Sequence, residues 1–214
     1  MRKLGDLEAA RLLKKYRIPV ARQFLTKDEK QAVRAGKMIG YPVALKVSSP
    51  DIIHKTDAGC VLAGIDSEEK LIEGFRTIMR RARKISRRVD GVLVQEMAEP
   101  DSVELIIGSK IDSQFGGVIM FGLGGIFTEI LRDVSFRLVP VGRKDAREML
   151  AEIKGRRILE GTRGRKPVDT GKLEDLILNV SRMVQKEKKI RELDLNPVFA
   201  NENGVVVVDA KILV

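Results

Sequence analysis

The sequence has 214 residues, of which 43% are hydrophobic and 33% charged, and its formal net charge is +10. A chain of this length can bury one substantial core or two small lobes, and this composition excludes a disordered protein. The longest weakly polar run, residues 116–127, is too short and too rich in glycine to span a bilayer. No charged start followed by an apolar stretch marks a signal peptide, so a cytoplasmic protein without membrane contact is expected. The single cysteine, Cys60, excludes an internal disulfide and a cysteine-based zinc site.

The first half of the chain alternates predicted helices and strands. Hydrophobic periodicity and breaker residues predict helices over 6–16, 27–40 and 67–88, and strands over 21–26, 42–49, 61–65 and 91–97. Eleven residues that include Pro50, Asp57 and Gly59 separate the second and third strands. This arrangement predicts a hairpin with a long tip.

The second half follows a Pro-Asp turn at 98–102, which is the expected hinge. Strands are predicted at 103–111, 116–124, 136–141 and 205–214, and helices at 144–154 and 171–190. The last strand is expected to be broken by Asp209 and Lys211, and the loop 155–170 shows no periodicity. Hairpin-linked strands favour an α+β fold of two α/β lobes, 1–97 and 98–214, with the N-terminal helix able to pack on the second lobe.

The positive charge raises nucleic acid as a partner, because nine residues at 80–88 include five arginines and a lysine. Apolar residues of this helix recur at helical spacing, so the arginines fall mostly on the opposite face. A solvated helix face is therefore favoured over a nucleic-acid patch. With 4% aromatic residues and no tryptophan, stacking platforms for single strands are not expected.

Two features could contact phosphate. The glycine-rich stretch 121–130 follows a strand but matches neither GxxxxGK[ST] nor GxGxxG, so a tight turn is favoured over a phosphate cradle. Lys46 lies inside an apolar strand, where it must pair with an anion or extend to solvent. Extension to solvent is the commoner outcome, although such a lysine can also hold nucleotide phosphates.

Hard oxygen ligands gather near the C-terminus at Asp194, Asn196 and Asp209. If the two strand-like segments pair through the turn 201–204, Asn196 and Asp209 can meet at one end of a hairpin. Such a pair suits Mg²⁺, which accepts one or two side-chain oxygens together with phosphates and water. The alternative is a local ion pair between Asp209 and Lys211 or another lysine.

His54 is the only histidine in the chain and lies in the predicted hairpin tip. Taken alone, it is better explained as an ordinary surface residue than as a catalyst. Its neighbours Lys55 and Asp57 offer an anion-binding group and an orienting base.

Together, four stretches of the sequence resemble one family, the ATP-grasp (β) subunit of the ADP-forming acetyl-CoA synthetases, related to succinyl-CoA synthetase. They are "GYPVALKVSSPDIIHKTDAG", "VLVQEMA", "VELIIGSKIDSQFGGVIMFGLGGIFTEILRDVSFRLVPV" and "LDLNPVFA…VVVDAK". The resemblance runs from about Leu4 to the C-terminus, in the expected order and separations.

The resemblance implies a two-lobed ATP-grasp fold that clamps ATP or ADP with Mg²⁺. The nucleotide-binding residues it implies are Lys46 for phosphates, a tip from Ser48 to Gly59 that includes Lys55, the segment Gln95, Glu96 and Met97 for adenine, and Glu104 for ribose. Asn196 and Asp209 would hold Mg²⁺. His54 would relay a phosphoryl group, with Asp194 orienting its imidazole.

The family reaction is acyl-CoA + ADP + phosphate ⇌ carboxylic acid + ATP + CoA, and a separate α subunit binds CoA and carries another phosphorylated histidine. The resemblance therefore implies a CoA-binding α partner, in an α₂β₂ assembly. One departure is Cys60, where the family usually has a second glycine after the aspartate of the histidine loop. The alternatives are another ATP-grasp ligase, an ATP-grasp domain detached from a fused acyltransferase-type chain, and a basic nucleic-acid-binding protein.

Overall fold

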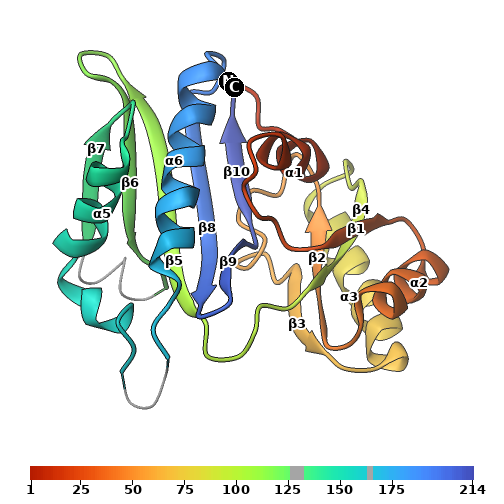
Figure 1. Cartoon of the computed structure of the whole chain (residues 1–214). Coiled ribbons are helices and arrows are strands. Elements are labelled where there is room, and N and C mark those ends of the chain that lie inside the picture. The colour runs from red at the N-terminus through yellow and green to blue at the C-terminus, as the bar shows by residue number, and fades with distance from the viewer. Residues whose placement is uncertain (126–132, 163–165) are drawn as a thin grey trace. The chain divides into compact units, whose positions relative to one another are not determined.

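A computed structural model of the chain describes residues 1–125, 133–162 and 166–214 (Figure 1). These residues form two compact units. The small unit is Ala21–Met97, and the large unit combines Met1–Val20 with Ala98–Val214. The N-terminal segment therefore packs with the C-terminal half of the chain rather than with the residues that follow it.

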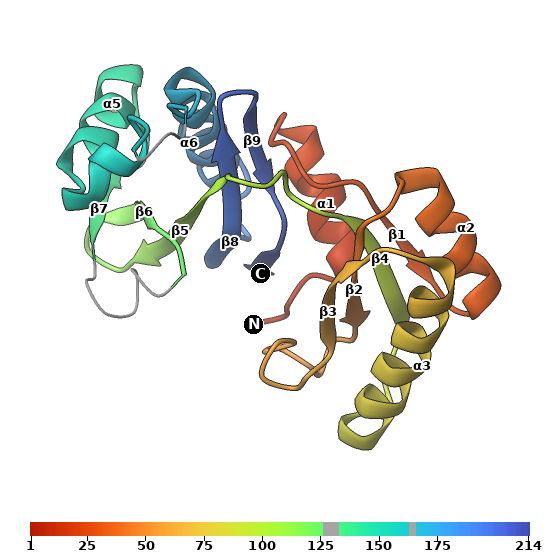
Figure 2. The ribbon, with the colours of Figure 1, turned by 90° about the horizontal axis from the view of Figure 1, so that it is seen from below.

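The small unit is a four-stranded antiparallel sheet in the order β1-β4-β2-β3, with two helices on one face (Figure 2). Its elements are β1 (Gln23–Thr26), α2 (Glu29–Ile39), β2 (Val43–Ser48), β3 (Val61–Ile65), α3 (Glu68–Ile85) and β4 (Gly91–Glu96). β2 and β3 pair as the predicted hairpin. The core between sheet and helices contains Leu45, Leu71 and Ile78, all fully buried.

Local sequence signals determine where these helices begin and end. The side chain of Asp28 accepts a hydrogen bond from the backbone of Gln31 at the start of α2, and Gly40 ends that helix with a φ of 91°. Along α3 the apolar residues are buried or, at Ile72 and Met79, half-buried, and the arginines of 80–88 are exposed, as predicted for a solvated face. Ile85 is the exception: it is 55% exposed, because the helix ends there.

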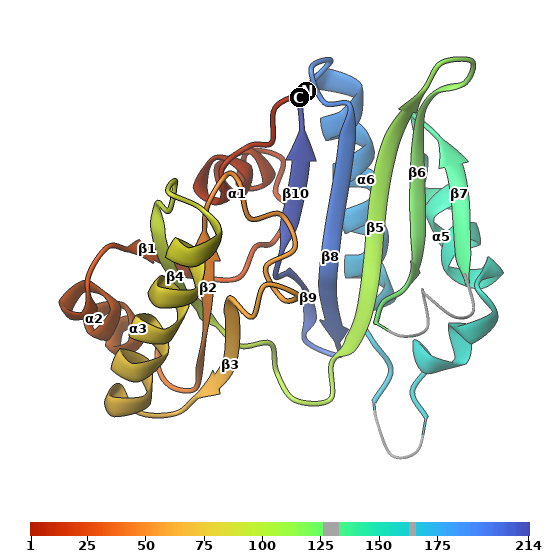
Figure 3. The same ribbon diagram turned by 180° about the vertical axis from the view of Figure 1, so that it is seen from behind.

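The large unit contains an antiparallel sheet in which the strands lie in the order β10-β8-β5-β6-β7. The remaining strand, β9, pairs with β8. Its elements are α1 (Asp6–Lys15), β5 (Val103–Asp112), β6 (Gly116–Leu123), β7 (Val134–Leu138), α5 (Arg143–Glu152), a 3₁₀ turn η1 (Lys154–Ile158), α6 (Thr170–Lys186), β8 (Glu192–Asn201), β9 (Gly204–Val207) and β10 (Ala210–Leu213). α5 and α6 cover one face of this sheet, as the opposite views of Figures 1 and 3 show. No helix within the described ranges is both long and apolar enough to cross a membrane.

The final segment differs from the single broken strand that the sequence predicts. β9 pairs with the later half of β8 and β10 with its earlier half, so the chain shifts at Val208 and Asp209 between two pairings. Two backbone bonds hold this shift, from Asn196 to the carbonyl of Asp209 (3.1 Å) and from Val208 to the carbonyl of Pro197 (3.0 Å). Lys211 lies within β10 and does not interrupt it.

The N-terminal segment is attached to the large unit at both ends. Arg2 and Val214 exchange backbone hydrogen bonds of 2.7 and 2.9 Å, so the two termini lie side by side (Figure 1). After α1, the backbone of Val207 donates to the carbonyl of Pro19 at 2.9 Å. These bonds explain why the helix at 6–15 belongs to the large unit.

Candidate functional site

Residues 49–60, here called the His54 loop, connect β2 to β3. Ile52, Lys55 and Cys60 are buried, whereas His54 between them is exposed. The backbone of Ala58 donates to the carbonyl of His54 (3.1 Å), and Cys60 donates to that of Lys55 (2.8 Å). The loop is therefore a folded turn that directs a single imidazole to solvent while its flanks reach the core.

The turn closes at Gly59, which has a φ of 62°. This left-handed conformation is unfavourable for residues that carry a Cβ. The carbonyl of Gly59 accepts a hydrogen bond of 2.6 Å from the guanidinium of Arg81 on α3. Gly59 is thus required by the backbone conformation of the loop itself.

Cys60, the departure from the family pattern, is a core residue of the small unit. Its side chain is fully buried in the cluster that contains Ile52 and Ile78. Burial raises the pKa of the thiol, and the nearby Arg81 opposes this only in part. Because the thiol packs inward, a second glycine is not needed to keep the turn closed.

Lys46 and Ser48 lie on β2, the strand that leads into the His54 loop. Both are buried, with 7% and 4% of their surface exposed. Lys46 therefore does not extend into solvent, which was the commoner outcome expected from sequence. It lies opposite Leu93 of β4 and Val61 of β3.

Gln95 and Glu96 end β4, and Met97 follows them. Gln95 is buried and donates to the side chain of Gln23 at 3.1 Å. The carboxylate of Glu96 accepts from the backbone of Arg22 (2.7 Å) and from its guanidinium (2.6 Å). The Glu96 side chain is thus engaged within the small unit.

In the large unit, Glu104 lies against the glycine-rich stretch at the end of β6. The backbone of Gly124 donates to the carbonyl of Glu104 at 2.7 Å. A Cβ on Gly124 would lie 2.7 Å from Cγ of Glu104, and one on Gly125 would lie 3.2 Å from its carboxylate. These two glycines leave room for the glutamate, whereas residues 126–130 of the stretch lie outside the described part of the chain.

Asn196 and Asp209 meet at the shift between β9 and β10, through the backbone bond already described. The predicted pairing of their segments is therefore confirmed. The alternative partner considered for Asp209, Lys211, forms an ion pair of 2.8 Å with Glu192. Among the residues that the structure describes, no three His, Cys, Asp or Glu side chains gather as a metal site.

Asp194 lies two residues before Asn196 on β8 and lines a cavity of about 320 Å³ with Lys110 and Phe136. Its cross-strand neighbours are Lys211 of β10 on one side and Gly108 of β5 on the other. Burial raises the pKa of Asp194; Glu192 and Asp209 act in the same direction, and Lys211 opposes them. A carboxylate in such a place can accept a hydrogen bond from a cationic ligand and would be stabilised by it.

Comparison with known proteins identifies the family of the chain. The family described as "ATP-grasp domain" matches residues 1–214. The β subunits of acetate–CoA ligase (ADP-forming) I and II from Pyrococcus furiosus are each 46% identical to the chain. The chain covers 92% and 90% of their lengths, and the matches cover 99% and 97% of the chain. The chain belongs to the ATP-grasp subunits of the ADP-forming acetate–CoA ligases.

This ATP-grasp family also includes longer chains. The acetate–CoA ligase (ADP-forming) II of Archaeoglobus fulgidus is 45% identical over 211 residues, which are 99% of this chain and 30% of that protein. Acetyl-coenzyme A synthetase 1 of Ca. Korarchaeum cryptofilum, solved with coenzyme A and Ca-AMPCP, superposes with a TM-score of 0.96 and 42% identity, covering 100% of this chain and 93% of that one. The α+β ATP-grasp fold expected from the sequence is therefore confirmed.

The structure assigns the predicted residues of this ATP-grasp subunit to two separate groups. The small unit holds the group on the β2–β3 hairpin and β4, and the large unit holds the group at Glu104 and on β8 to β10. Sequence reasoning did not find Arg22 or Arg81. Neither could be found from local periodicity, since each acts on a residue more than 20 positions away.

Proposed function

We propose that the chain is the nucleotide-binding subunit of an ADP-forming acyl-CoA synthetase and relays a phosphoryl group through His54. The observation that carries this proposal is the His54 loop. It presents the only imidazole of the chain to solvent on a closed turn whose flanks are buried. A neutral imidazole near pH 7 is a competent nucleophile, and a turn held at both ends limits where it points.

Residues of both units would bind the nucleotide. Lys46 would contact the phosphates, and Ser48, Lys55 and Gly59 would lie over them in and beside the His54 loop. Gln95, Glu96 and Met97 would meet the adenine. Glu104 would accept the ribose hydroxyls. The two units would act as the two lobes of the clamp, with the boundary near residue 97 and the N-terminal helix on the second lobe.

Asn196 and Asp209 suit Mg²⁺, because they supply an amide and a carboxylate oxygen from adjoining backbone positions. Since no cluster of three or more His, Cys, Asp or Glu side chains gathers in the described ranges, this pair fits an ion that takes its other ligands from phosphates and water. Bound there, Mg²⁺ would neutralise phosphate charge. A relative from Ca. Korarchaeum cryptofilum has been solved with Mg-AMPPCP.

In the phosphoryl step, a ring nitrogen of His54 would attack the γ-phosphorus of ATP. An N–P bond would form as the bond from phosphorus to the β,γ-bridging oxygen breaks, and ADP would leave with the electron pair. The reverse step would deliver the phosphoryl group to ADP. Lys46 would offset the charge that develops, and Asp194 would stabilise the phosphorylated imidazole.

A CoA-binding α subunit would complete the enzyme, as an α₂β₂ assembly. Two findings support a partner: the Pyrococcus relatives are named as β subunits, and the fused relatives are about three times longer than this chain. A related Korarchaeum structure includes a phosphohistidine segment that points towards the nucleotide site. The acyl substrate would bind to the partner.

The test is to incubate the chain with Mg²⁺ and ATP labelled in the γ-phosphate, with and without the α partner. We expect acid-labile, base-stable label on this chain, since His54 is its only histidine. His54→Gln should abolish the label, whereas Thr56→Ala, at an exposed position of the same loop, should retain it. Label that survives His54→Gln, or that never appears with the partner present, would refute the relay.

A further inference from the structure

The first end of the His54 loop is attached to the C-terminal end of α3. The hydroxyl of Ser49 donates to the carbonyl of Arg88 at 2.6 Å. Asp51 accepts a hydrogen bond of 2.5 Å from Ser86 and lies 3.5 Å from the guanidinium of Arg88. Three interactions, two hydrogen bonds and one ion pair, therefore hold residues 49–51 against the residues that follow the helix.

The second end is attached to the same helix by Arg81, one turn before the helix ends. Its guanidinium donates to the carbonyl of Gly59 at 2.6 Å, and the positive charge of the donor strengthens this hydrogen bond. The guanidinium also lies 3.3 Å from the place where a Cβ of residue 59 would be. Arg81 thus contacts the residue whose left-handed conformation closes the turn.

The helix under Arg81 is itself fixed against the loop. Ile78 and Ala82, the helix positions on either side of Arg81, are fully buried in the cluster that includes Ile52 and Cys60 of the loop. Packing therefore sets the distance between α3 and the turn, and only a long side chain on the exposed face can reach over to the Gly59 carbonyl. His54 lies between the two attachments and is held by neither.

We propose that Arg81 is a positioning residue: it holds the turn from His54 to Gly59 in one conformation and thereby sets the rate at which His54 accepts a phosphoryl group. The rate part of this proposal rests on the proposed function, whereas the conformational part does not. Without Arg81 the turn loses its side-chain hydrogen bond to α3 at Gly59, while its backbone bonds and the attachment at residues 49–51 remain. The imidazole would then sample several positions, few of them in line with a phosphate.

The experiment compares Arg81→Met and Arg81→Lys with Arg83→Met in the full chain. Arg83 is exposed on the same helix, two positions further on, and so faces away from Arg81. Because the chain has one histidine, ¹³C-histidine labelling gives one imidazole signal that reports on the loop directly. Hydrogen exchange at Ala58 and Cys60 reports on the closure of the turn, and labelled ATP gives the rate and KM of phosphorylation.

In Arg81→Met we expect at least a tenfold lower rate of label uptake, an unchanged KM for ATP and an unchanged melting temperature. The imidazole signal should move towards its position in the urea-unfolded chain, and exchange at the turn should rise at least tenfold. Arg81→Lys should recover part of the rate, because an ammonium can also donate to the carbonyl. Arg83→Met should match the wild type.

If Arg81→Met takes up the phosphoryl label as fast as the wild type, the rate part of the proposal is wrong, although the relay through His54 is not contradicted. An unshifted imidazole signal together with unchanged exchange would overturn the conformational part. If the wild-type chain itself accepts no label, the proposed function and the rate part both fail. The imidazole signal and amide exchange still decide in that case whether Arg81 holds the loop.

Discussion

Two neighbouring residues of the His54 loop, Gly59 and Cys60, have different physical requirements. Gly59 is fixed by a positive φ and Cys60 by a buried side chain. The sequence marks both as small residues at the end of the loop that holds His54, but it does not separate a conformational requirement from a packing one. Substitutions at each position should therefore have different consequences for stability and for the loop.

Cys60→Gly restores the glycine that the family usually has there and should lower stability. The change removes a buried thiol and adds backbone freedom, which together cost about 2 kcal/mol. Chemical denaturation measures this loss. Since the thiol packs into the core, phosphoryl label on His54 should remain at the wild-type level. A loss of label under conditions in which the variant is fully folded would contradict a purely structural role for Cys60.

Gly59→Ala should cost about 1–2 kcal/mol of stability, because alanine is strained at a φ of 62°. Gly64→Ala on β3 is the matched control, since its φ of 72° is similar and no atom lies within 4 Å of its Cβ position. Both variants should lose stability in urea, but only Gly59→Ala should slow the labelling of His54. Equal labelling rates in the two variants would argue against a role for the turn.

At the scale of elements, α1 is joined to the end of α6 through Glu187. Its carboxylate accepts hydrogen bonds of 2.7 Å from both Lys15 and Tyr16. The bond from Lys15, followed by that from Tyr16, holds the pKa of Glu187 below its ordinary value. This contact is one reason why the first helix belongs to the large unit.

Because the pKa of Glu187 is lowered, its contribution to the free energy of unfolding should fall as the pH falls. A carboxylate with a depressed pKa in the folded state adds stability that is present above its ordinary pKa and is lost as the pH falls through the depressed value. Glu187→Gln should therefore reduce the free energy of unfolding by about 0.5–1 kcal/mol at pH 7, and this difference should shrink as the pH falls below about 4, towards the depressed pKa. Urea titrations from pH 3 to 7 measure this, with Glu160→Gln, an exposed site of the same unit, as control.

Helices and strands are the level that the sequence predicts best. Hydrophobic periodicity locates α2 and α3, and Asp28 and Gly40 mark the ends of α2. The final segment is less predictable, because "VVVVDAKILV" is apolar enough for one strand. Its division into β9 and β10 depends on which residues of β8 are left to pair, and that information is not local.

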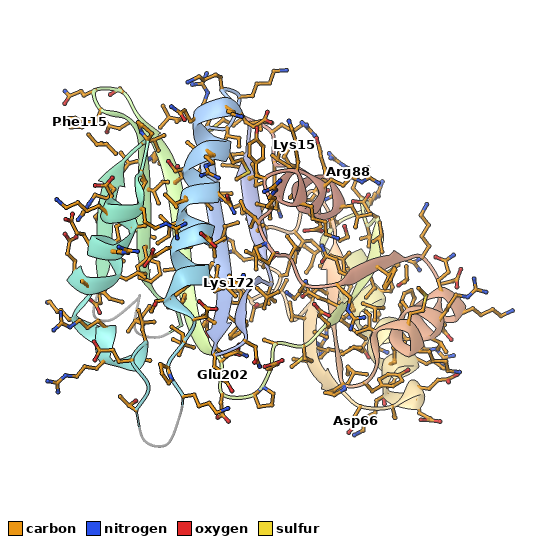
Figure 4. All side chains as sticks on the ribbon, in the orientation of Figure 1. Lys15, Asp66, Arg88, Phe115, Lys172 and Glu202 are labelled. Carbon is orange, nitrogen blue, oxygen red and sulfur yellow. The ribbon has the colours of Figure 1, made fainter. Side chains whose placement is uncertain are left out.

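At the scale of the whole molecule, the proposed site draws on both units. Lys46→Met in the small unit and Glu104→Gln in the large unit should each weaken the binding of ADP with Mg²⁺ about tenfold or more, since each removes a charged partner worth about 1.5–3 kcal/mol. Lys172→Met, on the exposed side of α6, is the control (Figure 4). Calorimetry measures the affinities, and an unchanged affinity in either variant would remove that unit from the site.

The sequence by itself determined the α+β class, most of the elements and the family, because periodicity, breakers and short motifs depend on residues close together in the chain. Only the tertiary structure decided that residues 1–20 pack with residues 98–214, that the Glu96 side chain is held by Arg22, and that Arg81 contacts Gly59. The reason is physical. An exposed arginine can reach many carbonyls, and the packing of buried residues such as Ile78 and Cys60 determines which one lies within its reach.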